Sequence, residues 1–471
     1  MAEHEEFSEP IYKAHCLMVP IPAQGHITPV LQFAKYLIPR KIRVTLALTR
    51  FISKTANISS SSAAGGGIHL ETISDGFDEH GLAVTDDGQV YFDTFERVGS
   101  QTLADLVRKQ SDAGHPVNCI LYDPHIPWCL DVSKRFGLIG AAFFTQSCAV
   151  DAVFYHVHRG LLKPPVTEVE ETVSIPGLPP FEPHDLPSFV HDGSYPAFLA
   201  ALVGQFSNIQ NADWVLCNSV HELEPKAADW LSKNLPNFKT IGPTLPSFYL
   251  DKQLPDDKDY GLSFFKPDNE ACSNWLQSKP KRSVVYVSFG SIADLGPEHV
   301  EELCWGLKNS NHYFLWVVRS SEEAKLPLMF KAETAEKGLI VSWCSQLEVL
   351  ASGAVGCFLT HCGWNSTLEA MSLGVPMVAM PRWTDQTTNA KFISDVWKTG
   401  VKAKKDEKKG VVGRDEIERC VKEVMEEGEE TRRNCDKFAK LCKDAVGECG
   451  SSCRSITLFA DSLILASRTH P

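Results

Sequence analysis

The sequence lacks a long apolar run, a secretory leader and a surplus of positive charge. No stretch approaches the roughly 18 uninterrupted apolar residues of a membrane-spanning helix. The amino terminus is acidic and has no apolar segment typical of a signal peptide, so we expect a cytoplasmic protein without a membrane span. Lys and Arg number 46 against 59 Asp and Glu, which gives a net charge of −13. This balance argues against a nucleic-acid partner, because proteins that bind duplexes usually carry a basic face.

Two signatures of large α/β enzymes are also missing. A nicotinamide-dependent oxidoreductase needs G-x-G-x-x-G directly after a strand, whereas the glycine cluster at 65–67 falls in a predicted loop. A serine hydrolase needs G-x-S-x-G, which does not occur. The fifteen cysteines are an odd number without a disulfide framework, so we expect reduced thiols.

Short apolar runs alternate with amphipathic segments along most of the 471 residues. Near-continuous apolar strands separated by helices predict parallel sheets covered on both faces. The expected strands are residues 16–21, 44–48, 68–73, 119–122, 141–144, 214–217, 284–289, 314–318, 339–341, 355–360 and 377–379. Helical patterns lie between several of them, at 29–37, 127–136 and 148–162, and the chain after residue 410 reads as helix only.

A change in composition divides the sequence into two halves. Prolines and a polar Asp-Lys run mark residues 246–282 as an interdomain linker. We therefore expect α/β domains at 1–245 and 283–455 and a terminal helix at 456–471. The predicted fold class is α/β, with two doubly wound, Rossmann-like domains that face each other across a cleft.

A polar turn follows the first predicted strand and reads P-A-Q-G-H-I-T-P. Gly25 would permit a tight turn and Pro29 suits the first turn of a helix, which places His26 at the carboxyl end of a strand. The N–H groups of that helix would help to keep His26 neutral, as a general base requires. Asp123 ends a later strand and could hold one ring nitrogen of the histidine. A histidine that only caps the turn and an aspartate that only caps a helix remain the alternatives.

A second polar turn, T-H-C-G-W-N-S-T around His361, lies between a predicted strand and a helix. Gly363 would let the backbone approach a ligand, Asn365 or Ser366 could cap the helix, and such a helix start binds anions. Glu369 could accept hydrogen bonds from sugar hydroxyls or form a capping box with Ser366.

Residues near these turns add the remaining groups of a nucleotide-sugar pocket. Trp343 could stack on a base, although a core role is the better reading of this tryptophan alone. Asp385 and Gln386 start a predicted helix and could bind hexose hydroxyls, and Ser291 lies in a donor-rich turn after a strand.

The segment from Trp343 to Gln386 carries a family resemblance. Its 44 residues read WCSQLEVLASGAVGCFLTHCGWNSTLEAMSLGVPMVAMPRWTDQ. This segment resembles the signature box of the plant family 1 UDP-glycosyltransferases, and the P-x-P-x-Q-G-H-x-x-P, L-Y-D-P and F-F-T-Q-S segments agree. Stretches such as IGPTLPSFYLD are similar to a branch acting on salicylate, indole acids, thiohydroximates, and steroid or triterpenoid aglycones.

The resemblance implies a GT-B fold, inverting chemistry, and no permanently bound cofactor or metal. UDP-glucose would be the sugar-donor cosubstrate, bound by the domain at 283–455, and the terminal helix would pack back on the acceptor-binding domain at 1–245. The implied donor contacts are Trp343 and the Cys344 backbone for uracil, Gln346 and Glu369 for ribose, Ser291, His361, Gly363, Asn365 and Ser366 for the diphosphate, and Trp364, Asp385 and Gln386 for the sugar. His26, assisted by Asp123, would deprotonate the acceptor.

The acceptor is expected to be an apolar small molecule such as a steroid, terpenoid or phenolic, glucosylated on a hydroxyl or carboxyl group. Its candidate contacts are Gln24, Gly25, Phe143, Phe144, Gln146, Tyr155, Phe189 and Phe198. We expect a monomer. The D-x-D spelling at residues 257–259 lies in the linker, so we do not predict a metal site there. The alternative function is a non-catalytic UDP-sugar-responsive binding protein, which would have no need of His26 and Asp123.

Overall fold

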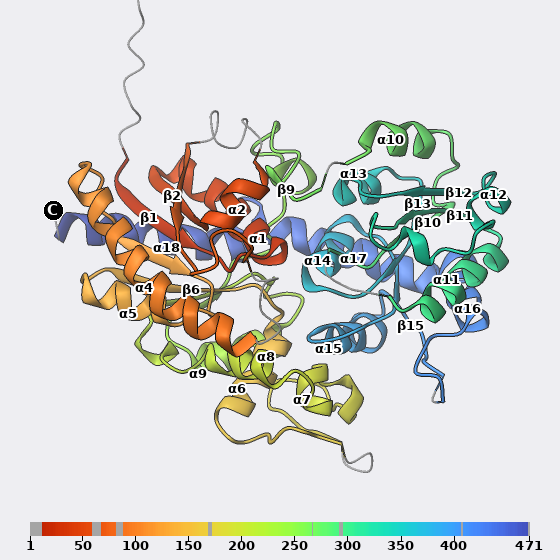
Figure 1. Cartoon of the computed structure of the whole chain (residues 1–471), viewed down its shortest axis with the longest axis horizontal. Coiled ribbons are helices and arrows are strands. Elements are labelled where there is room, and N and C mark those ends of the chain that lie inside the picture. The colour runs from red at the N-terminus through yellow and green to blue at the C-terminus, as the bar shows by residue number, and fades with distance from the viewer. Residues whose placement is uncertain are drawn as a thin grey trace, which may run out of the picture.

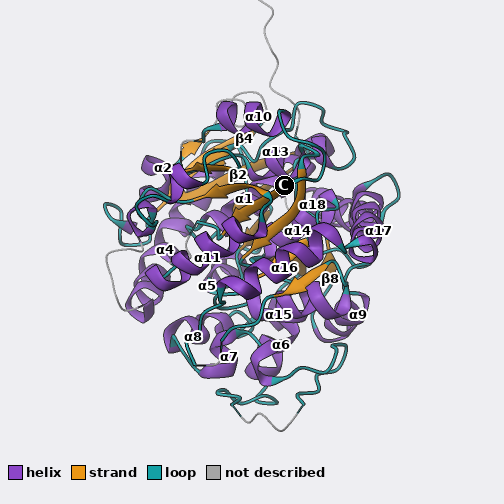
Figure 2. Cartoon of the chain, turned by 90° about the vertical axis from the view of Figure 1, so that its right-hand side faces the viewer, coloured by secondary structure: helices purple, strands orange, loops and turns teal. Residues whose placement is uncertain are grey.

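Two α/β halves lie side by side along the long axis of the molecule (Figure 1). The structure is a computed structural model that describes residues 12–58, 67–81, 88–167, 172–265, 267–291, 295–406 and 408–469. Most of the glycine cluster at 65–67 lies outside these ranges. Helices surround the strands, as the end-on view shows (Figure 2).

A parallel sheet of seven described strands organises the first half, in the order β4-β2-β1-β5-β6-β7-β8. Apolar side chains bury both of its faces, as the near-continuous apolar runs predict. Its strands are β1 (Ala14–Val19), β2 (Ile42–Thr49), β4 (Ile68–Ile73), β5 (Cys119–Tyr122), β6 (Ile139–Phe144), β7 (Trp214–Cys217) and β8 (Phe238–Thr240). Its helices are α1 (Gln24–Leu37), α2 (Arg50–Thr55), α4 (Gly88–Asp112), α5 (Trp128–Arg135), α6 (Cys148–His158), α7 (Ser188–Asp192), α8 (Pro196–Gly204) and α9 (Pro225–Asn234).

The second half contains a parallel sheet of six described strands, in the order β12-β11-β10-β13-β14-β15. Its strands are β10 (Val284–Ser288), β11 (Tyr313–Val317), β12 (Gly338–Val341), β13 (Val355–Thr360), β14 (Met377–Ala379) and β15 (Gly400–Lys402). The helices from the linker onward are α10 (Asn269–Gln277), α11 (Pro297–Ser310), α12 (Phe330–Glu333), α13 (Gln346–Ala351), α14 (Trp364–Leu373), α15 (Gln386–Lys391), the π-helix Phe392–Val396, α16 (Arg414–Glu426), α17 (Glu429–Val446) and α18 (Ser451–Thr469).

Each sheet has one position where the chain order reverses, between β1 and β5 in the first half and between β10 and β13 in the second. Doubly wound sheets bind ligands outside the carboxyl ends of their strands at this position. The turns that follow these four strands are therefore brought together in pairs, and they carry the polar residues singled out from the sequence.

The terminal helix α18 runs back from the second half to the first (Figure 1) and packs against β1, β8 and α1. Its residues Ile456, Phe459 and Leu463 join the core beneath the first sheet. The helix begins at Ser451, five residues before the predicted boundary at 456. The division into domains at 1–245 and 283–455 stays a prediction. No described helix has the length and apolar character needed to cross a bilayer.

Some elements differ from the sequence prediction. The edge strands β8 and β15 were not expected, because their sequences, Phe-Lys-Thr and Gly-Val-Lys, are not continuous apolar runs. A short antiparallel pair, β3 (Asn57–Ile58) with β9 (Leu262–Ser263), joins the linker to the first half. Helix α1 begins at Gln24, so Pro29 lies inside the helix and not in its first turn as expected.

Candidate active site

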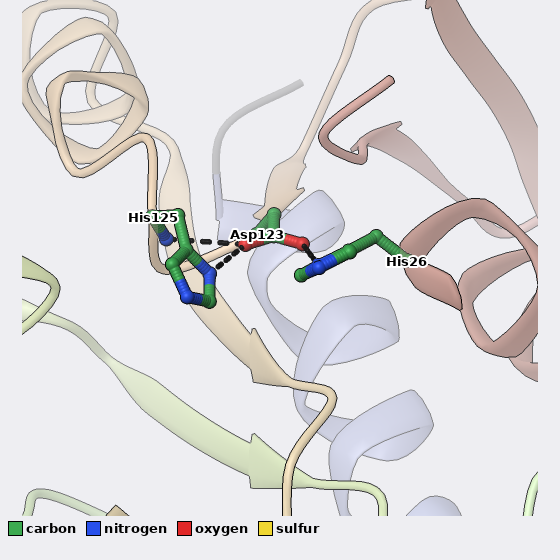
Figure 3. Close-up of side chains that lie close together, drawn as sticks. All are labelled: His26, Asp123 and His125. Carbon is green, nitrogen blue, oxygen red and sulfur yellow. Dashed lines mark hydrogen bonds and ion pairs between the residues drawn. The ribbon is translucent and has the colours of Figure 1, made fainter. Parts of the chain in front are cut away.

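The turns after β1 and β5 bring a histidine and an aspartate into contact (Figure 3). The Nδ1–H of His26 donates to Oδ2 of Asp123 at 2.5 Å. Asp123 is fully buried, whereas His26 keeps about a quarter of its side chain exposed. This pair therefore has one buried carboxylate and one ring with an accessible edge, the arrangement of a base and the group that orients it.

Asp123 has a second partner that the sequence analysis missed. His125 donates to Oδ1 of Asp123 from its ring Nδ1, at 2.7 Å, and from its backbone N–H, at 3.1 Å. The signal was present in the sequence, because an aspartate commonly accepts from the backbone two residues on. Thr145, at the end of β6, places its hydroxyl 3.2 Å from Nδ1 of His26.

The charges around this pair decide its protonation. Burial lowers the pKa of His26, but the carboxylates of Asp123 and Asp385 outweigh burial and raise that pKa above its ordinary value of 6.5. Burial would also raise the pKa of Asp123, yet His26 and His125 hold it well below its usual range. The expectation that helix N–H groups keep His26 neutral is therefore wrong: the facing carboxylates dominate.

Gly25 differs from its expected role as a turn former. It lies in the first turn of α1, and a Cβ added there would contact only the Asn365 side chain, at 3.7 Å. Its carbonyl accepts from Nδ2 of Asn365 at 2.8 Å. A residue next to His26 is thereby joined to the polar turn of the other half.

The polar turn after β13 leads into an uncapped helix start. The N-cap of α14 is Gly363, which supplies no side-chain cap, so the expectation that Asn365 or Ser366 caps the helix is wrong. The first N–H groups of such a helix have no intrahelical partner and are available to bind an anion. Cys362, just before this N-cap, has a left-handed φ of 66°, a backbone strain typical of functional turns.

The imidazole of His361 lies between two glycines at this site. A Cβ on Gly290 would come within 2.9 Å of Nε2 of His361, and one on Gly363 within 2.5 Å, so both positions exclude side chains. Burial lowers the pKa of His361 to about 4, so the ring is neutral near pH 7. Its Nδ1 has no hydrogen-bond partner among the described residues. Ser291 follows Gly290, and its carbonyl accepts from the Arg319 guanidinium at 2.6 Å.

The groups expected to bind ribose form a partly buried network around the buried carboxylate of Glu369. Glu369 accepts from Nε2 of Gln346 at 2.6 Å and from the hydroxyl of Tyr260, a linker residue, at 2.7 Å. Gln346 also donates to the Ser366 hydroxyl at 2.9 Å. Burial raises the pKa of Glu369 to about 7. The capping-box alternative for Glu369 is therefore wrong, and Tyr260 is a site residue that sequence reasoning missed.

The aromatic side chain expected to stack on the base has a neighbour from the linker. The ring of Trp343 packs against Phe265, with centroids 4.3 Å apart. The next residue, Cys344, is buried, and its sulfur lies 3.7 Å from the Tyr286 hydroxyl. Trp343 is thus packed against a linker residue about eighty positions away in the sequence.

Asp385 and Gln386 lie at the start of α15, after β14. Asp385 is buried and accepts from the Thr384 hydroxyl and from the Asn389 amide. Oε1 of Gln386 accepts from the backbone N–H groups of Arg382 and Trp383, at 2.9 and 3.2 Å. This orientation leaves the amide nitrogen of Gln386 as the group that could donate to a sugar.

Trp364 is used differently from the expected sugar contact. Its side chain is buried, and its indole N–H donates to the backbone carbonyl of Asn218 in the first half at 2.7 Å. The indole therefore stabilises the contact between the halves. Trp364 is the first residue of α14 and contributes only its backbone to the start of that helix.

Comparison with known proteins identifies the family. The profile of the UDP-glucoronosyl and UDP-glucosyl transferase family matches residues 219–448. Mogroside I-E synthase of Siraitia grosvenorii is 45% identical over 453 residues, which cover 95% of this chain and 98% of that protein. The chain is a plant family 1 UDP-glycosyltransferase.

Two further relatives agree with this assignment. Flavonol 7-O-beta-glucosyltransferase UGT74F1 of Arabidopsis thaliana is 44% identical over 458 residues, covering 96% of this chain and 98% of that protein. The crystal structure of Os79 from O. sativa in complex with UDP superimposes with a TM-score of 0.88 at 41% identity, covering 95% of this chain and all of that one. The glycosyltransferase therefore has the GT-B fold of two Rossmann-like domains and takes a UDP-sugar as donor.

The glycosyltransferase buries three of the aromatic residues expected to contact its acceptor. Phe143 packs against Phe33 and Phe144 against Phe206, with centroids 5.3 and 5.5 Å apart. Tyr155 is only 4% exposed and also packs against Phe206. In this structure these side chains belong to the core. Phe143 and Phe144 are consecutive residues of the buried strand β6 and face the two covered sides of the sheet, whereas Tyr155 packs into the core from α6.

Phe189 is also buried, at 2% exposed, but together with the half-buried Phe198 it belongs to a row of aromatic rings that reaches the donor half. Phe189 contacts Tyr195 and Trp383, with centroids 5.4 and 5.8 Å apart. Phe198 continues the row from Tyr195 to Phe92. Trp383 directly precedes Thr384 and Asp385. This row, which we call the aromatic row, therefore connects the first half to the residues expected to bind the sugar.

Gln24 and Gln146 flank the catalytic pair in sequence, next to Gly25 and Thr145. The amide oxygen of each is buried and has no hydrogen-bond partner among the described residues. Buried polar groups normally have partners. These two oxygens are therefore unsatisfied acceptors close in sequence to the catalytic pair, and neither is exposed to solvent in this structure.

The D-x-D segment of the linker has a structural role. Asp257 accepts from Lys35 at 2.6 Å, from Gln32 at 2.7 Å and from the backbone N–H of Ser247 at 2.8 Å. Both of its carboxylate oxygens are thus engaged in fixing the linker to α1.

Proposed function

We propose that this enzyme transfers glucose from UDP-glucose to a hydroxyl or carboxyl group of an apolar small molecule, with inversion to a β-glucoside. The observation that carries the proposal is the His26–Asp123 pair, which the Asn365–Gly25 hydrogen bond joins to the first turn of α14. A base for the acceptor and an anion site for the leaving group are thereby held in neighbouring positions.

In the proposed mechanism, the free Nε2 of His26 accepts the acceptor proton. Asp123 holds the Nδ1–H of the ring, fixes its tautomer and stabilises the imidazolium that forms. The deprotonated oxygen attacks the anomeric carbon on the face opposite UDP, and the bond from that carbon to the diphosphate breaks. Negative charge that develops on UDP is met by the N–H groups at the start of α14 and by His361 as a neutral donor.

The donor site is proposed to bind its ligand in three parts. Uracil stacks on Trp343 and pairs with the Cys344 backbone, ribose binds at Gln346 and Glu369, and the sugar binds at Asp385 and Gln386. Support comes from the partly buried network at Glu369 and from the orientation of Gln386, whose oxygen is engaged and whose nitrogen is free to donate. The diphosphate contacts proposed are Ser291, His361, Gly363, Asn365 and Ser366.

The acceptor is proposed to contact the aromatic row and the amide oxygens of Gln24 and Gln146. Aromatic faces favour an apolar, ring-containing molecule, and two amide oxygens favour a hydroxyl that donates. The names of the relatives agree with this class, since one forms a mogroside and another glucosylates flavonols. We propose no metal in the mechanism, because residues 257–259 lie in the linker and the carboxylate of Asp257 is engaged.

The test is an acceptor panel of phenols, terpenoids, steroids and aromatic acids, incubated with UDP-glucose and analysed by mass spectrometry. We expect a glucoside and an equal amount of UDP with at least one apolar acceptor. His26→Ala should reduce turnover by about 10²–10⁴-fold, the usual contribution of a general base, while UDP binding is retained. UDP-glucose binding without turnover in wild type would favour the alternative, a non-catalytic UDP-sugar-responsive binding protein.

A further inference from the structure

The carboxylate of Asp385 is held by two neighbours from its own half. Thr384 donates its hydroxyl to Oδ1 of Asp385 at 3.0 Å, and Asn389 donates its amide to Oδ2 at 2.7 Å. Asp385 is 9% exposed and Asn389 only 1%. A buried carboxylate keeps the orientation that its hydrogen-bond donors give it. Thr384 and Asn389 therefore set the direction in which the Asp385 carboxylate points.

Each of these neighbours is in turn held by a serine of the first half. The backbone N–H of Thr384 donates to the Ser188 hydroxyl at 2.7 Å, and the Thr384 carbonyl accepts from the Ser188 N–H at 2.9 Å. The Ser147 hydroxyl donates to Oδ1 of Asn389 at 3.2 Å. Both lines of hydrogen bonds that orient Asp385 therefore begin in the half that carries the catalytic pair.

Two backbone conformations show that this arrangement is imposed by its partners. Thr384 has a left-handed φ of 53°, and Cys362 has one of 66°. Residues other than glycine adopt this region only where the surroundings hold them. Ser188 bonds both backbone groups of Thr384, and Asn389 donates to the carbonyl of Cys362 at 3.0 Å. The same contacts thus hold Asp385 and the turn that leads into α14.

We infer that Ser188 and Asn389 are positioning residues for the sugar end of the donor site. Through them the acceptor-binding half orients Asp385, so that recognition of the sugar depends on correct contact between the two halves. This inference rests on the proposed function, in which Asp385 binds the sugar. Neither serine lies in the 44-residue signature segment, and Asn389 lies three residues after its end.

The inference is tested with Ser188→Ala and Asn389→Leu, compared with Ser188→Thr and Thr388→Val. Ser188→Thr keeps the hydroxyl. Thr388→Val removes a buried hydrogen bond of 2.7 Å between the same halves, to the carbonyl of Asp185, without touching Asp385. The half-buried position of Ser188 favours folding of its variants, and thermal melting checks all four proteins.

We expect Ser188→Ala and Asn389→Leu to lower kcat/KM for UDP-glucose by roughly 10- to 100-fold, since a displacement near 1 Å can cost about 10²-fold. Their preference for UDP-glucose over UDP-galactose should narrow. The Kd for UDP should stay within about twofold of wild type in Ser188→Ala, which retains the uracil and diphosphate contacts. Asn389→Leu also loses the hydrogen bond to the Cys362 carbonyl and should bind UDP more weakly. Ser188→Thr should keep the wild-type preference for UDP-glucose over UDP-galactose, and Thr388→Val should resemble wild type. Losses in Thr388→Val equal to those in Ser188→Ala, or a parallel loss of UDP affinity in Ser188→Ala, would overturn the inference.

A binding measurement separates this inference from the proposed function. The ratio of the Kd values for UDP and UDP-glucose reports the contribution of the sugar without any turnover. If wild type binds UDP-glucose but transfers nothing, the proposed function fails. The inference is tested separately, because it requires that Ser188→Ala and Asn389→Leu change the ratio of these Kd values while Thr388→Val does not.

Discussion

Asp123→Asn is the substitution that tests the proposed base most directly. Asp123 is fully buried and receives two hydrogen bonds from His125 on Oδ1 and one from His26 on Oδ2. An asparagine has nearly the same shape, and the two His125 donors require its oxygen on their side. Its amide nitrogen must then face Nδ1 of His26 and donate to it.

The consequence is a change of tautomer. A ring that accepts at Nδ1 carries its proton on Nε2, so that nitrogen can no longer accept the acceptor proton. In a serine-protease triad this exchange costs about 10⁴-fold in kcat, and a general base is usually worth about 10²–10⁴-fold. We therefore expect kcat with an alcohol acceptor to fall by about 10²–10⁴-fold, which is about 2.7–5.5 kcal/mol in the barrier.

The pH dependence gives a second readout with a defined sign. Because Asp123 and Asp385 raise the pKa of His26 above 6.5, the neutral base appears only above that raised value. Wild-type kcat/KM should therefore increase with pH through it. In Asp123→Asn the charge of Asp123 no longer raises the pKa of His26. The pH at which the remaining activity rises should therefore be lower than in wild type.

The assay is steady-state turnover of UDP-glucose with an aliphatic alcohol acceptor across this pH range, with UDP affinity from calorimetry. Asp185→Asn is the control: Asp185 is equally buried and paired with Lys391 and Lys402, but does not touch His26. The control should lose stability and keep most of its turnover. Wild-type turnover in Asp123→Asn, with an unchanged pH profile, would refute the role assigned to the pair.

Three further predictions concern the donor site. A strong chelator should leave the rate unchanged, because the start of α14 supplies the diphosphate contacts; a loss of rate that Mn²⁺ restores would contradict this. Gln386→Ala should reduce kcat/KM for UDP-glucose roughly 10-fold or more at unchanged UDP affinity. Trp343→Ala should instead weaken the binding of both UDP and UDP-glucose by about 1–3 kcal/mol. Equal losses of UDP affinity in the two variants, measured by calorimetry, would refute the division of the donor site into a nucleotide end and a sugar end. Glu369, with its pKa raised to about 7, is protonated below that pH and loses acceptor capacity. UDP-glucose affinity should therefore rise as pH increases through about 7, and Glu369→Gln should abolish the change; a flat wild-type profile would contradict the ribose role.

The sequence alone determined the type of fold and the position of the candidate site. Apolar runs of four to eight residues specify buried parallel strands, because each such residue must leave water on one face of a sheet or the other. The turns with His26 and His361 follow such strands, and the carboxyl ends of parallel strands meet at one edge. The 44-residue segment from Trp343 to Gln386 then indicated the family, because its spacing spans three strand-to-helix turns.

Only the tertiary structure decided which groups contact one another and which are buried. The contacts of Phe265 with Trp343 and of Tyr260 with Glu369 join segments about eighty and about one hundred and ten residues apart, and no local pattern encodes such distances. The raised pKa of His26 is a sum over carboxylates from both halves, so helix position alone predicted the wrong direction. Residue type likewise could not show that Phe143 is core, because an apolar ring is suited equally to a pocket and to a sheet interior. These properties depend on how two sheets and a linker are placed in space, and periodicity along the chain carries no information about that placement.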